Sequence, residues 1–305
     1  MRQDGALAET RLDETRNFRH DAHQEMHLRE TKVRLKTNTG FAVRALAMMA
    51  ALVLPFASAS AGSTWDGLKP EVFGTRSIAS GIGIVSIKAP FRPEDQRAVP
   101  VSIDARFPDG RTVKSVTLVV DENPSPVAAV FNMGVARANV GLKLNIRLNQ
   151  ETHVRAVVEA SDGALYMAQQ LVRFAGGQAA CSAPPTGNPE EIAANMGKMK
   201  LANVPLDGNA SSIAHRVRLA ISHPNHTGMA LDQQTLLYIP LKMVASIGVS
   251  QGATKLFDMA GSITLSENPQ LEFDVDMTRE HKVGATLKDS DGAEWSRELE
   301  LPAGS

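Results

Sequence analysis

The chain has only one cysteine, Cys181, among its 305 residues. No internal disulfide can therefore form, and stability must come from apolar packing. Aromatic residues make up only 5%, and the formal charge is -1, so neither a base-stacking surface nor electrostatic attraction to nucleic acid or anionic membrane is indicated.

The common catalytic motifs are absent as well. The sequence contains no C-x-x-C, no G-x-S-x-G, no P-loop and no G-x-G-x-x-G followed by a helix. Its carboxylates show no paired spacing in an apolar setting. We therefore expect a protein that is not an enzyme and that needs no cofactor.

Long apolar runs are also missing. The longest one, residues 45–56, follows several basic residues and precedes the small residues 57–61. It is too short to span a membrane, which takes roughly 20 residues. This order of segments is typical of a secretory signal peptide cleaved after Ala59 or Ala61. We expect residues 1–61 to be a leader and signal peptide, with Met26 as a better natural start, and the mature chain to be exported to the periplasm.

What the chain does contain is strand periodicity. Val99, Val101 and Ile103 alternate with other residues, and residues 217–221 show the same pattern. Alternation with a period of two indicates a sheet with one buried face. Turn signals such as Asp162-Gly163 separate these segments, and the only convincing helical stretch is residues 189–200. The pattern predicts an all-β protein.

An internal repeat divides the strands into two sets. The segment Ser161-Asp162-Gly163-Ala164 recurs at residues 290–293, and apolar positions match at the same offset, without gaps, over three strands. A slip of one residue would turn each strand over, so the match predicts one sheet built twice. We expect two tandem immunoglobulin-like β-sandwiches, residues 62–181 and 213–305, joined by a linker rich in proline and glycine at residues 182–212.

Cys181 lies at the exit of the first sandwich, in a loop of glycine, alanine and proline. Gly176 and Gly177 would give this segment flexibility, and we expect an exposed thiol on a flexible arm. A lone thiol in an exported protein favours a chemical role over a structural one. His223 and His226 are candidate metal ligands, but Pro224 between them favours a turn, and only two ligands are evident.

At this point the residues resemble a known family. The first sandwich followed by a glycine-flanked cysteine resembles SoxY, the sulfur-carrier subunit of periplasmic sulfur oxidation, although Gln178, Ala179 and Ala180 separate the glycines from Cys181. The second sandwich is similar to SoxZ in its His-Pro, Ile-Pro, Asn-Pro and Asp-x-x-Gly marks, at residues 223–229, 239–240, 266–273 and 289–292. A fused chain of this kind is similar to the SoxYZ-like carriers associated with quinoprotein dehydrogenases.

The resemblance implies a periplasmic carrier that holds a sulfur-containing group on Cys181, as in thiosulfate oxidation. Its partners would be sulfur-oxidising enzymes, cytochromes or a pyrroloquinoline quinone dehydrogenase. A second hypothesis is a binding or assembly module for such a dehydrogenase or its cytochrome, in which Cys181 is dispensable. A third is a metal-delivery protein that uses His223, His226 and nearby methionines.

Overall fold

The structure is a computed structural model that describes residues 63–174, 176–204 and 214–301. The predicted signal peptide lies outside these ranges and stays a prediction. Within them, neither helix has the length and apolar character needed to cross a membrane.

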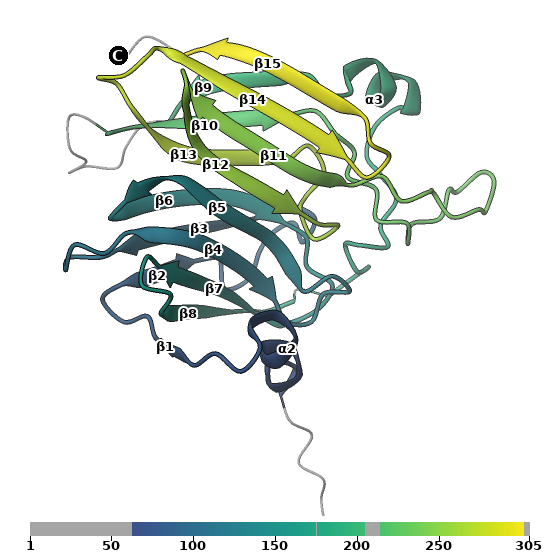
Figure 1. Ribbon diagram of the computed structural model, residues 1–305. Helices are drawn as coiled ribbons and strands as arrows, with labels where there is room; N and C mark the ends of the chain where they lie inside the picture. Colours follow the sequence, from purple (N-terminus) through teal and green to yellow (C-terminus); the bar gives the residue numbers. More distant parts are fainter. Residues whose placement is uncertain (1–62, 175, 205–213, 302–305) are drawn as a thin grey trace, which may run out of the picture. The chain divides into compact units, whose positions relative to one another are not determined.

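The described chain is almost entirely β (Figure 1). Its two helices are α2 (Thr64–Phe73) and α3 (Pro189–Asn195). The strands of the first half are β1 (Ile78–Ser80), β2 (Val85–Lys88), β3 (Val99–Arg106), β4 (Val113–Val120), β5 (Val127–Arg137), β6 (Asn139–Ile146), β7 (Thr152–Ala160) and β8 (Leu165–Val172). Those of the second half are β9 (Met199–Asn203), β10 (Ala214–Ile221), β11 (Val244–Gln251), β12 (Thr254–Gly261), β13 (Gln270–Asp276), β14 (Lys282–Asp289) and β15 (Glu294–Glu300).

The two halves are copies of one sandwich, and they share their sheets. The larger sheet has the order β1-β8-β7-β4-β5-β12-β11-β14-β15, and the smaller one β2-β3-β6-β13-β10-β9. Apart from β1, the second half of each order is the first half reversed. The all-β class and the two immunoglobulin-like sandwiches are confirmed. Their connection is more extensive than a linker, because β5 pairs with β12 and β6 pairs with β13.

The predicted repeat agrees with this topology. Strands β6, β7 and β8 correspond to β13, β14 and β15 at the offset of 129 residues. The equivalent strands β6 and β13 run antiparallel beside each other, with Leu144 opposite Leu271 and Leu142 opposite Phe273. Antiparallel pairing of equivalent strands relates the two sandwiches by an approximate two-fold axis, as in an isologous dimer interface.

The joint between the sandwiches is the contact of β5 with β12 and of β6 with β13. The apolar core is continuous across this joint. Phe131 of β5 packs edge-on against Phe257 of β12, with ring centroids 5.6 Å apart, and Phe257 packs against Phe273 of β13 at 5.3 Å. One cluster of buried apolar residues extends from Val85 to Leu301. The sandwiches therefore stabilise each other through buried area that neither would bury alone.

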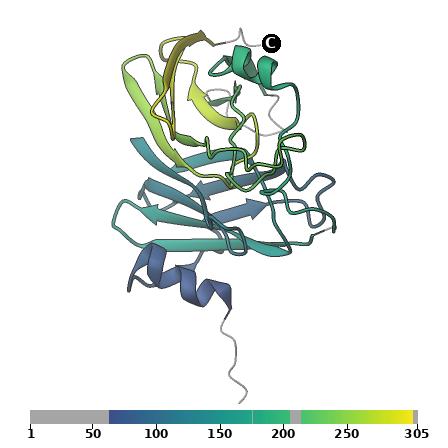
Figure 2. The same cartoon turned by 90° about the vertical axis from the view of Figure 1, so that its right-hand side faces the viewer.

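Helix α2 covers the outer face of the first sandwich (Figures 1 and 2). It begins with a capping box in which Ser63 and Asp66 bond reciprocally. Its Trp65 and Phe73 pack on outward-facing residues of β4, β7 and β8, which form a second, smaller apolar cluster.

The described part of the segment between the sandwiches, residues 182–204, contains regular structure. It forms helix α3 and strand β9, which pairs with β10 at the edge of the smaller sheet. The alternation of Met199 and Leu201 with polar residues is the strand signal there, and both side chains pack against the main core.

Candidate functional site: the cysteine arm

Residues 176–188, called the cysteine arm from here on, leave β8 and run along the joint to helix α3. Gly176, Gly177 and Gly187 have φ angles of 94°, 96° and 100°. Residues with a side chain rarely adopt a positive φ, so these three positions favour glycine. The arm therefore has a conformationally permissive residue near each end.

The expectation of an exposed thiol is wrong for this conformation. Cys181 is only 1% exposed. Its N–H donates to Asn149 Oδ1 at 3.0 Å, and its carbonyl oxygen accepts a hydrogen bond from Thr227 Oγ1. The small residues of the arm allow it to fold back onto the loop after β6 and the loop after β10, which together cover the thiol.

Burial changes the chemistry of the thiol. Desolvation raises the pKa of Cys181 to about 11, and the positive charge of Arg147 opposes that rise only in part. The thiolate is the reactive nucleophile. With the arm docked, Cys181 is therefore protonated at neutral pH and shielded from reagents in solution.

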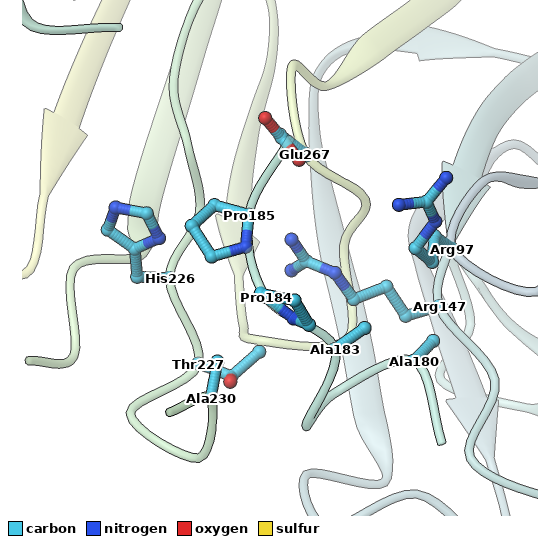
Figure 3. Close-up of a pocket in the computed structure, with 10 residues that line it drawn as sticks. All are labelled: Arg97, Arg147, Ala180, Ala183, Pro184, Pro185, His226, Thr227, Ala230 and Glu267. Atoms are coloured by element: carbon cyan, nitrogen blue, oxygen red, sulfur yellow. The ribbon is translucent and has the colours of Figure 1, made fainter. Parts of the chain in front are cut away.

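A small recess lies against the cysteine arm (Figure 3), although Cys181 itself is not one of its lining residues. Its volume is about 20 Å³. Arm residues on both sides of Cys181 line it together with charged and polar residues from both halves: Arg97, Arg147, Ala180, Ala183, Pro184, Pro185, His226, Thr227, Ala230 and Glu267. The walls of the recess thus come from the arm and from both sandwiches.

Arg147 was not expected from the sequence. Its side chain is 7% exposed, and its guanidinium reaches toward the Pro184–Pro185 segment in Figure 3. The signal that could have identified it is a break in the repeat, because the residue 129 positions later is Asp276. A charge reversal at a repeat position marks a residue that the shared fold does not require.

The two candidate metal ligands lie in different surroundings. His223 is buried, and its Nδ1 accepts a hydrogen bond from the Asn225 N–H at 3.0 Å, which is the turn arrangement favoured above. Burial lowers the pKa of His223 to about 4. His226 instead lines the recess. In the described ranges, no three His, Cys, Asp or Glu side chains are grouped in a way that could hold a metal ion.

The loop that follows β10 also carries an exposed apolar feature. Residues 231–241, called the apolar loop from here on, expose Leu236, Leu237 and Tyr238 by 73%, 69% and 67%. The backbone of the loop is held by hydrogen bonds such as Leu236 N to Asp232 O at 2.9 Å. An ordered loop that keeps large apolar side chains in solvent is typical of an interaction surface.

Comparison with protein-family models places these features in a known class. The model of "Sulfur oxidation protein SoxY" matches residues 69–179, and that of "Sulphur oxidation protein SoxZ" matches residues 207–300. Two sandwiches with an intervening cysteine arm thus correspond to the two components of a sulfur-oxidation carrier. The chain belongs to the fused SoxYZ-like carrier proteins, which are carriers and not catalysts. Cys181 lies two residues beyond the end of the SoxY match.

The solved structures that resemble this chain each cover about a third of it. The sulfur carrier protein SoxY from Chlorobium limicola f thiosulfatophilum is 26% identical, with a TM-score of 0.32 over 36% of this chain and 91% of its own. A superoxide reductase (neelaredoxin) from Ignicoccus hospitalis is 14% identical, with a TM-score of 0.24 over 30% of this chain and 79% of its own. No curated protein sequence matched.

Proposed function

We propose that this protein is a periplasmic carrier that holds a sulfur-containing group on Cys181 through an S–S bond and presents it to partner enzymes. The observation that carries the proposal is the position of the only cysteine, on an arm between a SoxY domain and a SoxZ domain. Fusion makes the association of the two domains intramolecular, at high effective concentration.

In this proposal the docked arm is the resting state. A buried, protonated thiol is a poor nucleophile, so loading requires the arm to leave the joint. Joining the thiol to a sulfur anion such as thiosulfate forms one S–S bond and releases one proton and two electrons. Because the chain has no second cysteine, those electrons must pass to the redox centre of a partner enzyme.

The test is the intact mass of protein taken quickly from the periplasm of sulfur-oxidising cells, with and without reductant, mapped to the Cys181 peptide. We expect an added mass on Cys181 that the reductant removes. The matched control is Cys181→Ser, which should fold normally and carry no adduct. A free Cys181 thiol while the pathway is active would contradict the carrier function.

The second candidate function is a binding module for a quinoprotein dehydrogenase or its cytochrome. Two observations favour it, the burial of the thiol and the exposure of the apolar loop. In that case Leu236→Ser with Leu237→Ser should abolish binding, whereas Cys181→Ser should leave it intact. Ile82→Ser is the control, because Ile82 is also exposed and apolar but lies in the first sandwich. Binding that survives the double substitution would rule this function out.

A further inference from the structure

Arg147 is a buried cation held by backbone carbonyls. Its Nη1 donates to Asn225 O at 2.8 Å, Leu265 O at 2.8 Å and Ile263 O at 3.3 Å, and its Nη2 donates to Pro224 O at 3.4 Å. All four acceptors are neutral backbone carbonyls. In the described part of the chain, no carboxylate forms a salt bridge with Arg147, although buried charges are usually paired.

These contacts leave part of the guanidinium unused. A guanidinium has five N–H donors in a fixed planar arrangement. Among the described residues none accepts a hydrogen bond from Nε, and Nη2 has a single acceptor. Nε–H and one Nη2–H are therefore available, and an arginine edge of this kind binds two oxygens of an oxyanion at once. Arg147 is one of the residues that line the recess.

The one carboxylate of the recess acts on Arg147 through its negative charge but forms no salt bridge with it. Glu267 is the only carboxylate among the lining residues, and its Oε2 accepts hydrogen bonds from Thr186 N and Oγ1, at 3.3 and 2.9 Å. Arg97 adds positive charge, although it pairs with Asp95 at 3.3 Å on the surface. Burial lowers the pKa of His226, which keeps this imidazole mainly neutral at pH 7.

The thiol lies within the electrostatic reach of Arg147. Ala180 and Ala183, on either side of Cys181, line the recess together with Arg147. The Cys181 N–H is bonded to Asn149, which follows Arg147 by two residues. The positive charge also acts directly on the thiol, because it lowers the pKa of Cys181 against the effect of burial.

We propose that Arg147 forms an oxyanion subsite that binds the terminal sulfonate of a sulfur group carried on Cys181. This rests on the proposed carrier function and adds a residue of this chain that would recognise the cargo. The recess volume of about 20 Å³ has room for roughly one water-sized group, hence for one sulfonate oxygen. The rest of the sulfonate would lie between the arm and residues 226–230, and the arm glycines allow the shift that this requires.

The test compares two adducts of similar size and opposite charge. Methanethiosulfonate reagents convert Cys181 into a mixed disulfide, as the thiolate displaces methanesulfinate, and leave either a 2-sulfonatoethyl or a 2-aminoethyl group. We measure the rate at which dithiothreitol removes each group from the native protein, and divide it by the rate in urea. The subsite predicts that the anionic adduct is released about tenfold more slowly than the cationic one, as a charge-assisted hydrogen-bond pair implies. Equal normalised rates would overturn it.

Variants separate the donor pair from general charge effects. Arg147→Lys keeps the charge but loses the planar donor pair, and should remove most of the difference. Arg137→Gln is the matched control, because Arg137 also donates to a backbone carbonyl, Asp274 O at 2.8 Å, but lies outside the recess. It should retain the tenfold difference. If the Lys variant does not fold, the comparison of the two adducts on the unchanged protein still decides.

The subsite and the carrier function can fail separately. A tenfold charge difference in vitro, with no sulfur adduct on Cys181 in cells, would retain the subsite and reject the carrier function. A sulfur adduct in cells with equal release rates in vitro would retain the carrier function and reject the subsite.

Discussion

The two sandwiches have equivalent strands but differ in what covers their larger sheet. In the first, Arg155 and Asp121 form a buried ion pair at 2.7 Å, and Trp65 of α2 lies over the guanidinium at 4.5 Å. The strand pairings place Gly252 and Gly284 at the equivalent positions of the second sandwich. A face of small residues needs no cover, whereas a face with a buried charge pair does.

The edges of the larger sheet differ in the same way. In the first half, β1 pairs in parallel with β8 and covers that edge. In the second half, β15 is the last strand of the sheet and carries alternating charges, including Glu294, Arg297 and Glu298. Charged side chains discourage pairing with other chains at a free edge. One architecture has thus been adapted twice, by an added helix in one copy and by surface composition in the other.

The largest expected effect comes from the charge pair that only the first sandwich has. Asp121→Ala leaves Arg155 buried without its partner, so we expect a loss of about 3–5 kcal/mol in the free energy of unfolding, measured by urea titration. Asp95→Ala is the control, because Asp95 forms an exposed pair with Arg97 and should cost less than about 0.5 kcal/mol. Similar losses in both variants would contradict the importance of burial.

The next effect tests whether the two sandwiches are one folding unit. Leu271→Ala removes a fully buried side chain opposite Leu144 at the joint and should cost about 3 kcal/mol. Because the core is continuous, Trp65 in the first half and Trp295 in the second should report the same transition, each followed in a variant where the other tryptophan is phenylalanine. Two separate transitions would show that the sandwiches fold independently.

The third prediction concerns the cysteine arm, which has no counterpart elsewhere in the chain. Its docking should slow alkylation of the thiol roughly hundredfold. With its pKa raised to about 11, the thiol should react with iodoacetamide at pH 7.5 roughly 100 times more slowly than in urea. The raised pKa means that the docked arm is fully stable below the ordinary thiol pKa and loses stability as the pH rises toward 11. Equal rates in native and unfolded protein would indicate that the arm is mainly undocked.

A smaller change should loosen the arm selectively. Thr227→Ala removes the hydrogen bond to the Cys181 carbonyl, worth about 1 kcal/mol, and should speed thiol labelling roughly fivefold. The control is Thr286→Ala, because the Thr286 hydroxyl also donates to a backbone carbonyl, Gly248 O at 3.5 Å, between β14 and β11. If both variants label equally fast, Thr227 has no specific role in docking.

The smallest effect concerns the apolar loop, which belongs only to the second sandwich. Leu236 has a φ of 57°, a conformation that costs a leucine about 1 kcal/mol and glycine much less. Leu236→Gly should therefore leave thermal stability unchanged or raise it by up to about 1 kcal/mol. Leu237→Gly, at an equally exposed position without positive φ, should give no gain. A clear loss with Leu236→Gly would mean that the leucine packs on its own protein.

The repeat could be predicted because strand alternation is a local property of the sequence. The offset that makes Leu144 equivalent to Phe273 can be read from the spacing of apolar residues, and the observed strands have the same offset. The contact between the sandwiches could not be predicted in this way, because the opposition of Leu144 and Leu271 depends on which sheet edges meet. The burial of Cys181 was missed for a similar reason. Its cover comes from Asn149 and Thr227, which are distant in sequence.

The attachment of the cysteine arm at both ends sets a working radius for the thiol. Cys181 is nine residues beyond the end of β8 at Val172. A fully extended chain spans at most about 3.5 Å per residue, so the sulfur can travel no more than about 30 Å from that anchor. Whatever reacts with Cys181 must bring its own reactive atom inside this sphere. The length of the segment between β8 and Cys181 therefore restricts the partners to those whose active site can come close to the joint.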